Sequence, residues 1–169
     1  MPALERYSGV LYEALDASTI SSDGHRFAGD HILIHSALFG LVSASDLIPA
    51  YRLSHNSRLP GVSLLTLWRA PLREVLATES GLVLDLRSDS YVKLGPAPHR
   101  SWYVRVVSED EGGRRTALAH FNKKAKGVFA RELILAGHSH DTIDSLLEWA
   151  RSRSIRLELS TAGVLDLVV

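Results

Sequence analysis

The order of helical and strand patterns along the chain is the feature that most restricts its fold. Apolar residues spaced three and four apart predict a first helix over Ala3–Leu15. Further helices are expected over His25–Phe39, which Gly40 would end, and over Leu64–Thr78. Pro71 lies inside the third segment and predicts a kink or a break there.

The second half of the chain alternates between strand and helix patterns. The apolar run Leu82–Leu86 predicts a strand buried on both faces. After it we expect a two-stranded hairpin, two helices and two closing strands, over Ser101–Ser108, Arg114–Phe121, Lys123–Leu135, Asp141–Arg153, Ile155–Leu159 and Val164–Val168. This order predicts a single mixed α+β domain over residues 1–169, with a small mixed sheet, a hairpin and flanking helices.

Positive charge is concentrated in the middle of a chain that is neutral overall. Residues 93–131, here called the basic segment, hold 9 Lys+Arg and 3 Asp+Glu, and they include all the lysines of the chain. A basic segment of this kind can attract a phosphate backbone even when the net charge is zero. The alternative is a solvated basic face without a ligand.

Several classes of site are excluded or unsupported by composition and motifs. The chain has no cysteine, which excludes disulfides, thiolate metal ligands and a cysteine nucleophile. It contains no P-loop, no GxGxxG fingerprint, no GxSxG elbow and no HExxH motif, so no cofactor is predicted. No apolar run approaches the ~20 residues that span a bilayer, and the first residues do not resemble a signal peptide. We therefore expect a cytoplasmic protein without a membrane partner.

Two polar clusters follow predicted elements and are candidates for a site. Arg52 follows the second helix and is expected to bind a phosphate or a carboxylate, or else to pair with Asp46 and hold the loop. Four polar side chains follow the buried strand Leu82–Leu86, where they are held rigidly at its carboxyl end: Ser88, Asp89, Tyr91 and Lys93. They are candidates for an acid, base and nucleophile set, and a plain turn is the alternative.

The third cluster is a run of lysines at the start of a predicted helix. Lys123, Lys124 and Lys126 open this helix, and Arg131 lies further along it. The N-terminus of a helix attracts anions, whereas cations there oppose the helix dipole. Lysines at this position therefore indicate an anionic partner, unless they are simply solvated.

Two pairs of histidines have spacings that suggest a metal site. His31 and His35 are four apart in a predicted helix, and His138 and His140 lie in the loop before the last helix. Neither pair has a third ligand at a recognisable spacing, so no metal site is predicted. The same loop resembles a helix-hairpin-helix element only in part, because Ser139 stands where the second glycine of that element is expected.

Taken together, these clusters resemble the YaaA family of bacterial peroxide-stress proteins. The residues that carry the resemblance, in order, are Tyr7–Tyr12, Ser36–Gly40, Asp46–Leu47, Tyr51–Leu53, Trp68, Leu86–Lys93 and Phe121–Gly127. The resemblance implies a mixed α/β fold with a basic cleft, DNA binding through a helix-hairpin-helix-like element, and a role in hydrogen peroxide defence. The residues implied to line the cleft are Arg52, Lys93, Lys123, Lys124, Lys126 and Arg131.

This sequence departs from the family pattern at its N-terminal end. Typical members have about eighty further residues before the Tyr7 motif, and no segment here matches them. The alternatives are a truncated piece, a natural short form, or half of an assembly in which a second chain supplies the missing part. An edge left exposed by the missing part would favour self-association.

Three functions follow as hypotheses. The first is a DNA-binding protein of the oxidative stress response that holds the phosphate backbone in a basic cleft. The second is a lyase or glycosylase-like enzyme acting on damaged nucleic acid or a nucleoside-like molecule, with Lys93 or Lys124 as nucleophile or base and Asp89 and Tyr91 assisting. The third is an iron-handling protein that uses the histidine pairs.

Overall fold

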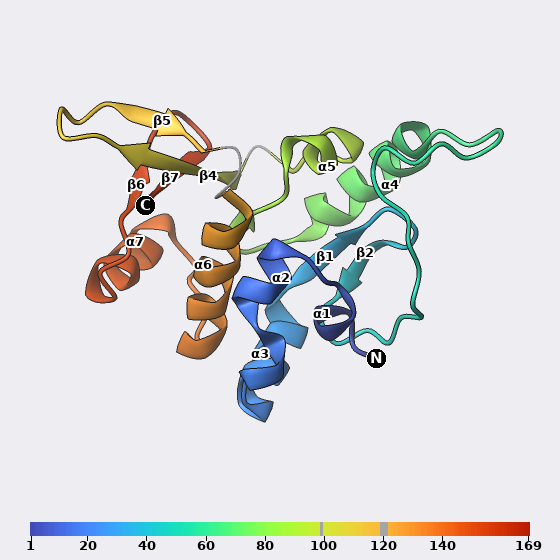
Figure 1. The fold of residues 1–169 in the computed structure, drawn as a ribbon, viewed down its shortest axis with the longest axis horizontal. Coiled ribbons are helices and arrows are strands. Elements are labelled where there is room, and N and C mark those ends of the chain that lie inside the picture. Colours follow the sequence, from blue (N-terminus) through green and yellow to red (C-terminus); the bar gives the residue numbers. More distant parts are fainter. Residues whose placement is uncertain (99, 119–121) are drawn as a thin grey trace.

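A computed structural model describes residues 1–98, 100–118 and 122–169, and it confirms the mixed α+β class. Helices and a two-stranded sheet form the N-terminal part, and a five-stranded sheet with two helices forms the C-terminal part (Figure 1). Within these residues, no helix has both the length and the apolar character needed to cross a membrane.

The first predicted helix is broken into two. Helix α1 covers Ala3–Arg6 and helix α2 covers Val10–Leu15. Gly9 separates them with a φ of 108°, a backbone conformation that other residues rarely adopt. A short 3-10 helix, η1 (Ala17–Thr19), then leads to α3 (Ser22–His31).

The prediction of a helix over His25–Phe39 is wrong in its second half. Helix α3 begins earlier, because the Ser21 hydroxyl accepts the Gly24 N–H, and it ends at His31. Strands β1 (Leu33–Ser36) and β2 (Gly40–Ser43) follow as an antiparallel hairpin. Within β1, buried residues alternate with more exposed ones. Burial therefore repeats every two residues, as in a strand.

Helix α4 (Leu64–Thr78) has the predicted bounds. Its N-terminus is capped by the Ser63 hydroxyl, which accepts the Thr66 N–H. Pro71 lies inside α4 without splitting it. The helix buries Leu72 and Leu76, and the Trp68 indole donates to the Ala37 carbonyl at 2.8 Å.

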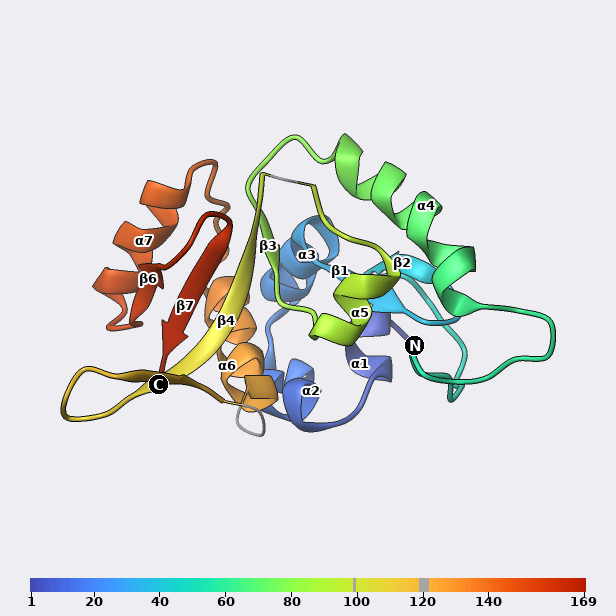
Figure 2. The ribbon, with the colours of Figure 1, turned by 90° about the horizontal axis from the view of Figure 1, so that it is seen from above.

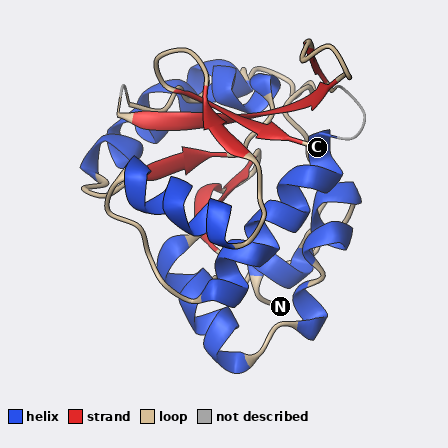
Figure 3. Ribbon diagram, turned by 90° about the vertical axis from the view of Figure 1, so that its left-hand side faces the viewer, coloured by secondary structure: helices blue, strands red, loops and turns tan. Residues whose placement is uncertain are grey.

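The five-stranded sheet has a strand at each predicted place. Its strands are β3 (Val83–Asp85), β4 (Ser101–Glu109), β5 (Arg115–Ala117), β6 (Leu157–Leu159) and β7 (Val164–Val168). The order is β3-β4-β7-β6, with β3 and β7 parallel to β4, β6 antiparallel to β7, and β5 paired antiparallel to β4 as the expected hairpin. Most of the helices lie below the strands of this sheet in Figure 3.

The prediction of a strand buried on both faces over Leu82–Leu86 is wrong, because the strand there lies at the edge of the sheet and Val83 and Leu84 are half-buried. The strand predicted over Arg114–Phe121 is shorter than expected, and residues 119–121 of that prediction lie outside the described residues.

Helices α6 (Asn122–Ala136) and α7 (Ile143–Ser152) cover one face of this sheet. Phe129 and Leu146 pack there against Val104, Val106 and Leu165. Helix α7 begins two residues later than the predicted Asp141, because the Thr142 hydroxyl caps it by accepting the Ser145 N–H. Seen from above, α6 lies between the five-stranded sheet and α2, so it joins the two parts of the molecule (Figure 2).

Candidate functional site

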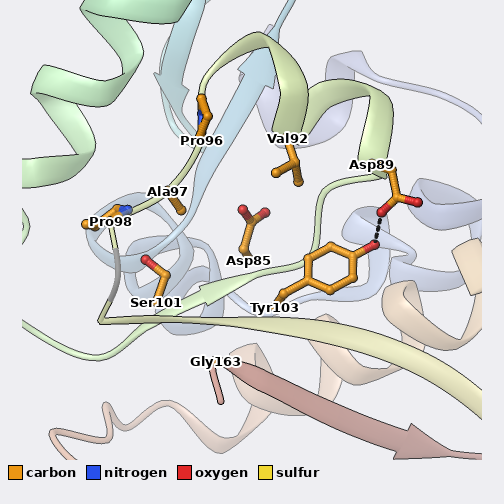
Figure 4. A pocket seen from close by; sticks show the side chains of 9 residues that line it. All are labelled: Asp85, Asp89, Val92, Pro96, Ala97, Pro98, Ser101, Tyr103 and Gly163. Carbon is orange, nitrogen blue, oxygen red and sulfur yellow. Dashed lines mark hydrogen bonds between the residues drawn. The ribbon is translucent and has the colours of Figure 1, made fainter. Parts of the chain in front are cut away.

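The candidate site lies where the end of β3, the start of β4 and α5 (Asp89–Leu94) meet. A pocket of about 330 Å³ is open at this point (Figure 4). Its lining residues are Asp85, Asp89, Val92, Pro96, Ala97, Pro98, Ser101, Tyr103 and Gly163. Polar side chains from both strands and from α5 therefore face one space with apolar walls.

A buried ion pair forms the base of the site. Asp85 is 7% exposed, and its two carboxylate oxygens accept Arg87 Nε at 2.8 Å and Nη2 at 2.6 Å. Arg87 Nη1 also lies 3.2 Å from Nδ1 of His35, which projects from β1. Burial first, and the Arg87 charge second, lower the pKa of His35 to about 4. His35 is therefore neutral at pH 7, and its Nδ1 accepts from Arg87.

Asp89 and Tyr103 form a second polar pair at the pocket. The Tyr103 hydroxyl donates to Asp89 Oδ1 at 2.8 Å (Figure 4). Burial, the hydrogen bond and the nearby carboxylates raise the pKa of Tyr103 above its ordinary value. Tyr103 therefore remains a protonated hydrogen-bond donor at neutral pH.

Lys126 is the lysine that the structure buries. It is 2% exposed, its Nζ donates to the Arg87 carbonyl at 3.2 Å, and Nζ lies 4.7 Å from the Tyr103 ring centroid. Burial lowers the pKa of Lys126 to about 8, although Asp85 and Asp89 act in the opposite direction. The amine is therefore more readily deprotonated than a solvated lysine.

A chain of hydroxyl groups fixes the loop that carries Arg52. Ser36 is 1% exposed, and its oxygen accepts the N–H groups of Leu38 and Phe39. The Tyr51 hydroxyl lies 2.5 Å from the Ser36 oxygen and 2.6 Å from the Tyr7 hydroxyl. Tyr51 is thus anchored to β1 and to Tyr7, the residue that follows α1, and the adjacent Arg52 is exposed on the surface.

The predicted binding residues divide into exposed and inward-facing groups. Lys123 and Lys124 on the first turn of α6, Lys93 on α5 and Arg52 are exposed. Lys126 faces the interior, as described above. Arg131 donates to the carbonyls of Leu15 and Asp16 at 2.7 and 2.9 Å, so it closes the C-terminal end of α2.

The predicted catalytic residues do not form one constellation. Asp89 lines the pocket, but Tyr91 packs edge-on against His35 and His55, with ring centroids 5.0 and 5.3 Å away. Lys93 and Lys124 are exposed, and neither lines the pocket. Residues 89 and 91 lie on different faces of α5, because residues that share a face of a helix are three or four positions apart.

The expected pairing of Arg52 with Asp46 is also absent from the described residues. Asp46 Oδ2 accepts the Ser43 N–H at 2.8 Å and closes the turn after β2 instead. Arg52 is therefore left exposed on its anchored loop.

The histidine pairs do not form a metal site in the described part of the chain. His31 ends α3 and packs on Phe27, whereas His35 lies on β1 and contacts Arg87, so the helical spacing assumed from the sequence does not exist. His138 and His140 lie together in the loop between α6 and α7, with ring centroids 4.9 Å apart. No group of three or more His, Cys, Asp or Glu side chains capable of holding a metal ion occurs among the described residues.

The sequence predictions missed Asp85, Arg87, Tyr103 and the environment of Lys126. A signal for Asp85 was present, because a carboxylate inside an apolar strand must be paired if it is buried. Its partner follows two residues later, at Arg87. Nothing local in the sequence distinguishes Lys126 from Lys123 and Lys124, because burial depends on where α6 packs.

Comparisons with known proteins show the family to which the chain belongs. A family model described as peroxide stress protein YaaA matches residues 1–153. A UPF0246 protein of Corynebacterium glutamicum strain R is 40% identical over 163 residues, which are 94% of this chain and 64% of that protein. A UPF0246 protein of Streptomyces coelicolor is 39% identical over 164 residues, 93% of this chain and 62% of that protein. The chain thus spans less than two thirds of the length of these relatives, and it belongs to the YaaA family of peroxide stress proteins.

Proposed function

We propose that this chain binds the phosphate backbone of duplex DNA as part of the response to hydrogen peroxide. The observation that carries the proposal is the exposure of Lys123 and Lys124 on the first turn of α6, a helix of 15 residues. Backbone N–H groups at the start of a helix attract phosphate. Two cations at the same place are electrostatically unfavourable, because they oppose the helix dipole. A bound phosphate removes this unfavourable interaction.

The ion pairs elsewhere in the molecule support this interpretation. Arg105 and Arg115 on the five-stranded sheet, and Arg156 directly before β6, are all paired with carboxylates, which belong to Asp166, Glu109 and Glu158. Within the described residues, neither Lys123 nor Lys124 forms an ion pair with a carboxylate. Their charge is therefore available to an external anion, and Arg52 and Lys93 are exposed as well.

Binding to the backbone predicts little dependence on base sequence. The test is fluorescence polarisation of labelled duplexes of two unrelated sequences, with wild type and with Lys123→Ala/Lys124→Ala. The control is Arg151→Ala/Arg153→Ala, which removes the same charge from exposed positions at the end of α7. We expect similar affinity for both duplexes and a loss only in the lysine variant. Equal losses of affinity in the two variants would show that only the net charge of the protein matters, and they would refute the assignment of DNA binding to Lys123 and Lys124.

A second candidate function is an enzyme with a lysine nucleophile. The burial of Lys126 beside Tyr103 and Asp89 favours it. Lys126, and not the exposed Lys93 or Lys124, is then the residue with the properties of a nucleophile.

A further inference from the structure

The surroundings of Lys126 differ from those of a buried lysine that only stabilises the fold. A buried ammonium group is costly unless it is paired with a carboxylate and hydrogen-bonded. Here the ammonium group makes one hydrogen bond, to the Arg87 carbonyl, and faces the Tyr103 ring. Both oxygens of the nearest buried carboxylate, Asp85, are already bonded to Arg87.

The position of this amine is fixed by the packing of α6. The next residue, Gly127, lies against the Leu11 carbonyl of α2 so closely that a Cβ would overlap it. On the other side, α6 packs against β4. A reactive group needs such a rigid support if it is to be held in a productive geometry.

A pocket with polar groups lies next to the amine. Tyr103 and Asp89 line it, and the ammonium group of Lys126 is 4.7 Å from the ring centroid of Tyr103. Ser101 also lines the pocket, and its buried hydroxyl has no hydrogen-bond partner within the described residues. Asp89 and Ser101 are suited to the hydroxyl groups of a sugar, and turning the Tyr103 side chain would join the amine to the pocket.

We propose that Lys126 is a nucleophilic amine that forms an imine with the open-chain aldehyde of an abasic deoxyribose held in this pocket. This proposal deepens the proposed function and rests on it, since DNA binding brings the sugar to the pocket. When the Tyr103 side chain turns, its hydroxyl leaves Asp89 and donates a hydrogen bond to the aldehyde oxygen, which polarises the carbonyl group.

The chemistry is balanced without any further reactant. The lone pair of the neutral amine forms a bond to the aldehyde carbon, and the carbonyl oxygen becomes a hydroxyl group. The oxygen receives one proton from the nitrogen when it becomes this hydroxyl and the second when it leaves as water, and a carbon–nitrogen double bond remains. The low pKa of Lys126, about 8, provides the neutral amine near physiological pH.

The test is reductive trapping with cyanoborohydride on a duplex that contains one abasic site produced by uracil excision. We expect a covalent protein–DNA product on a denaturing gel, with the modified peptide mapped to Lys126. Its yield is expected to rise with pH to half its maximum near pH 8, instead of near the 10.5 of an ordinary lysine. A purely structural lysine would give no such product and no such profile.

The main variant is Lys126→Arg, which keeps the positive charge but cannot form the imine. Its fold is checked by circular dichroism, and its binding by polarisation with a duplex that carries a tetrahydrofuran abasic analogue, which has no aldehyde. We expect binding to be retained and the trapped product to be lost. A product that persists in this variant, or that maps to Lys123 or Lys124 in wild type, would overturn the proposal.

A second probe distinguishes a failure of the proposed DNA binding from a failure of the imine proposal. If the tetrahydrofuran duplex does not bind wild type, the proposed DNA binding is wrong, and free 2-deoxyribose 5-phosphate is then trapped at high concentration instead. Modification confined to Lys126 would still support the reactive amine. If the duplex binds but neither probe modifies Lys126, the imine proposal is wrong and DNA binding stands.

Discussion

Gly127 of α6 lies directly against the backbone carbonyl of Leu11 in α2, with no space for a side chain between the two helices. A Cβ at residue 127 would overlap this oxygen and crowd Ala14. We therefore predict that Gly127→Ala destabilises the protein by about 1–3 kcal/mol or more, because overpacking forces the backbone to move. Urea unfolding measures the loss. Gly81→Ala is the control, since a Cβ there meets nothing within 4 Å, and an equal loss in both variants would contradict the prediction.

Because the ion pair of Asp85 and Arg87 is buried, we predict that replacing the Asp85 carboxylate strongly lowers the free energy of unfolding. Asp85→Asn would leave the Arg87 guanidinium, whose side chain is 15% exposed, without its charged partner. Removal of one partner of a buried pair typically costs about 3–5 kcal/mol. The exposed pair of Asp23 and Arg26 serves as the control, and we expect Asp23→Asn to cost less than about 1 kcal/mol. Similar unfolding midpoints for the two variants would show that Asp85 is not effectively buried.

Ser36 is expected to be required for the position of the Arg52 loop. Ser36→Ala would leave the N–H groups of Leu38 and Phe39 without their acceptor and would remove one of the two hydroxyl partners of Tyr51. Buried unsatisfied groups cost about 1–3 kcal/mol, so thermal unfolding should occur at a lower temperature. Ser18→Ala, which removes an exposed hydroxyl that bonds only Asp16, should leave the midpoint almost unchanged. The prediction fails if the two substitutions have the same effect.

Because His35 is partly buried beside Arg87, we predict that the stability of the protein falls as the pH is lowered. Its pKa is lowered to about 4 in the folded protein from an ordinary 6.5. Between these values the unfolded chain binds more protons than the folded one, so the free energy of unfolding falls as pH drops from 6.5 to 4. His35→Gln removes this contribution, and the stability difference between wild type and variant should therefore be smaller at pH 4.5 than at pH 7. A difference that does not change with pH would show that His35 titrates normally.

The parts of the fold that the sequence predicts are those whose signals are local. Neighbouring residues alone give the signals for three features: the serine cap of α4, the strand pattern of β7 and the turn between β4 and β5. These elements are found where the sequence predicts them. The failure over His25–Phe39 has a physical cause, since short apolar runs fit both a helix and a half-buried strand. The pairing of β1 with β2, which decides between them, is not visible in local periodicity.

The candidate site was predictable only in part for a related reason. Asp89 was identified because it follows a strand, and its place at the pocket agrees with that interpretation. The environment of Lys126 depends on contacts with Arg87 and Tyr103, which are 39 and 23 positions away in the sequence. Contacts of this range arise from packing, and a single sequence does not reveal them.

The most direct test of DNA binding through α6 is the salt dependence of affinity. Each phosphate neutralised by a cation contributes about 0.9 to the slope of log affinity against log salt concentration. The proposal predicts that Lys123→Ala/Lys124→Ala makes this slope shallower by about 1.8, while Arg151→Ala/Arg153→Ala leaves it unchanged. Equal slopes for wild type and the lysine variant would contradict the proposal, because the first turn of α6 would then make no contact with the phosphate backbone.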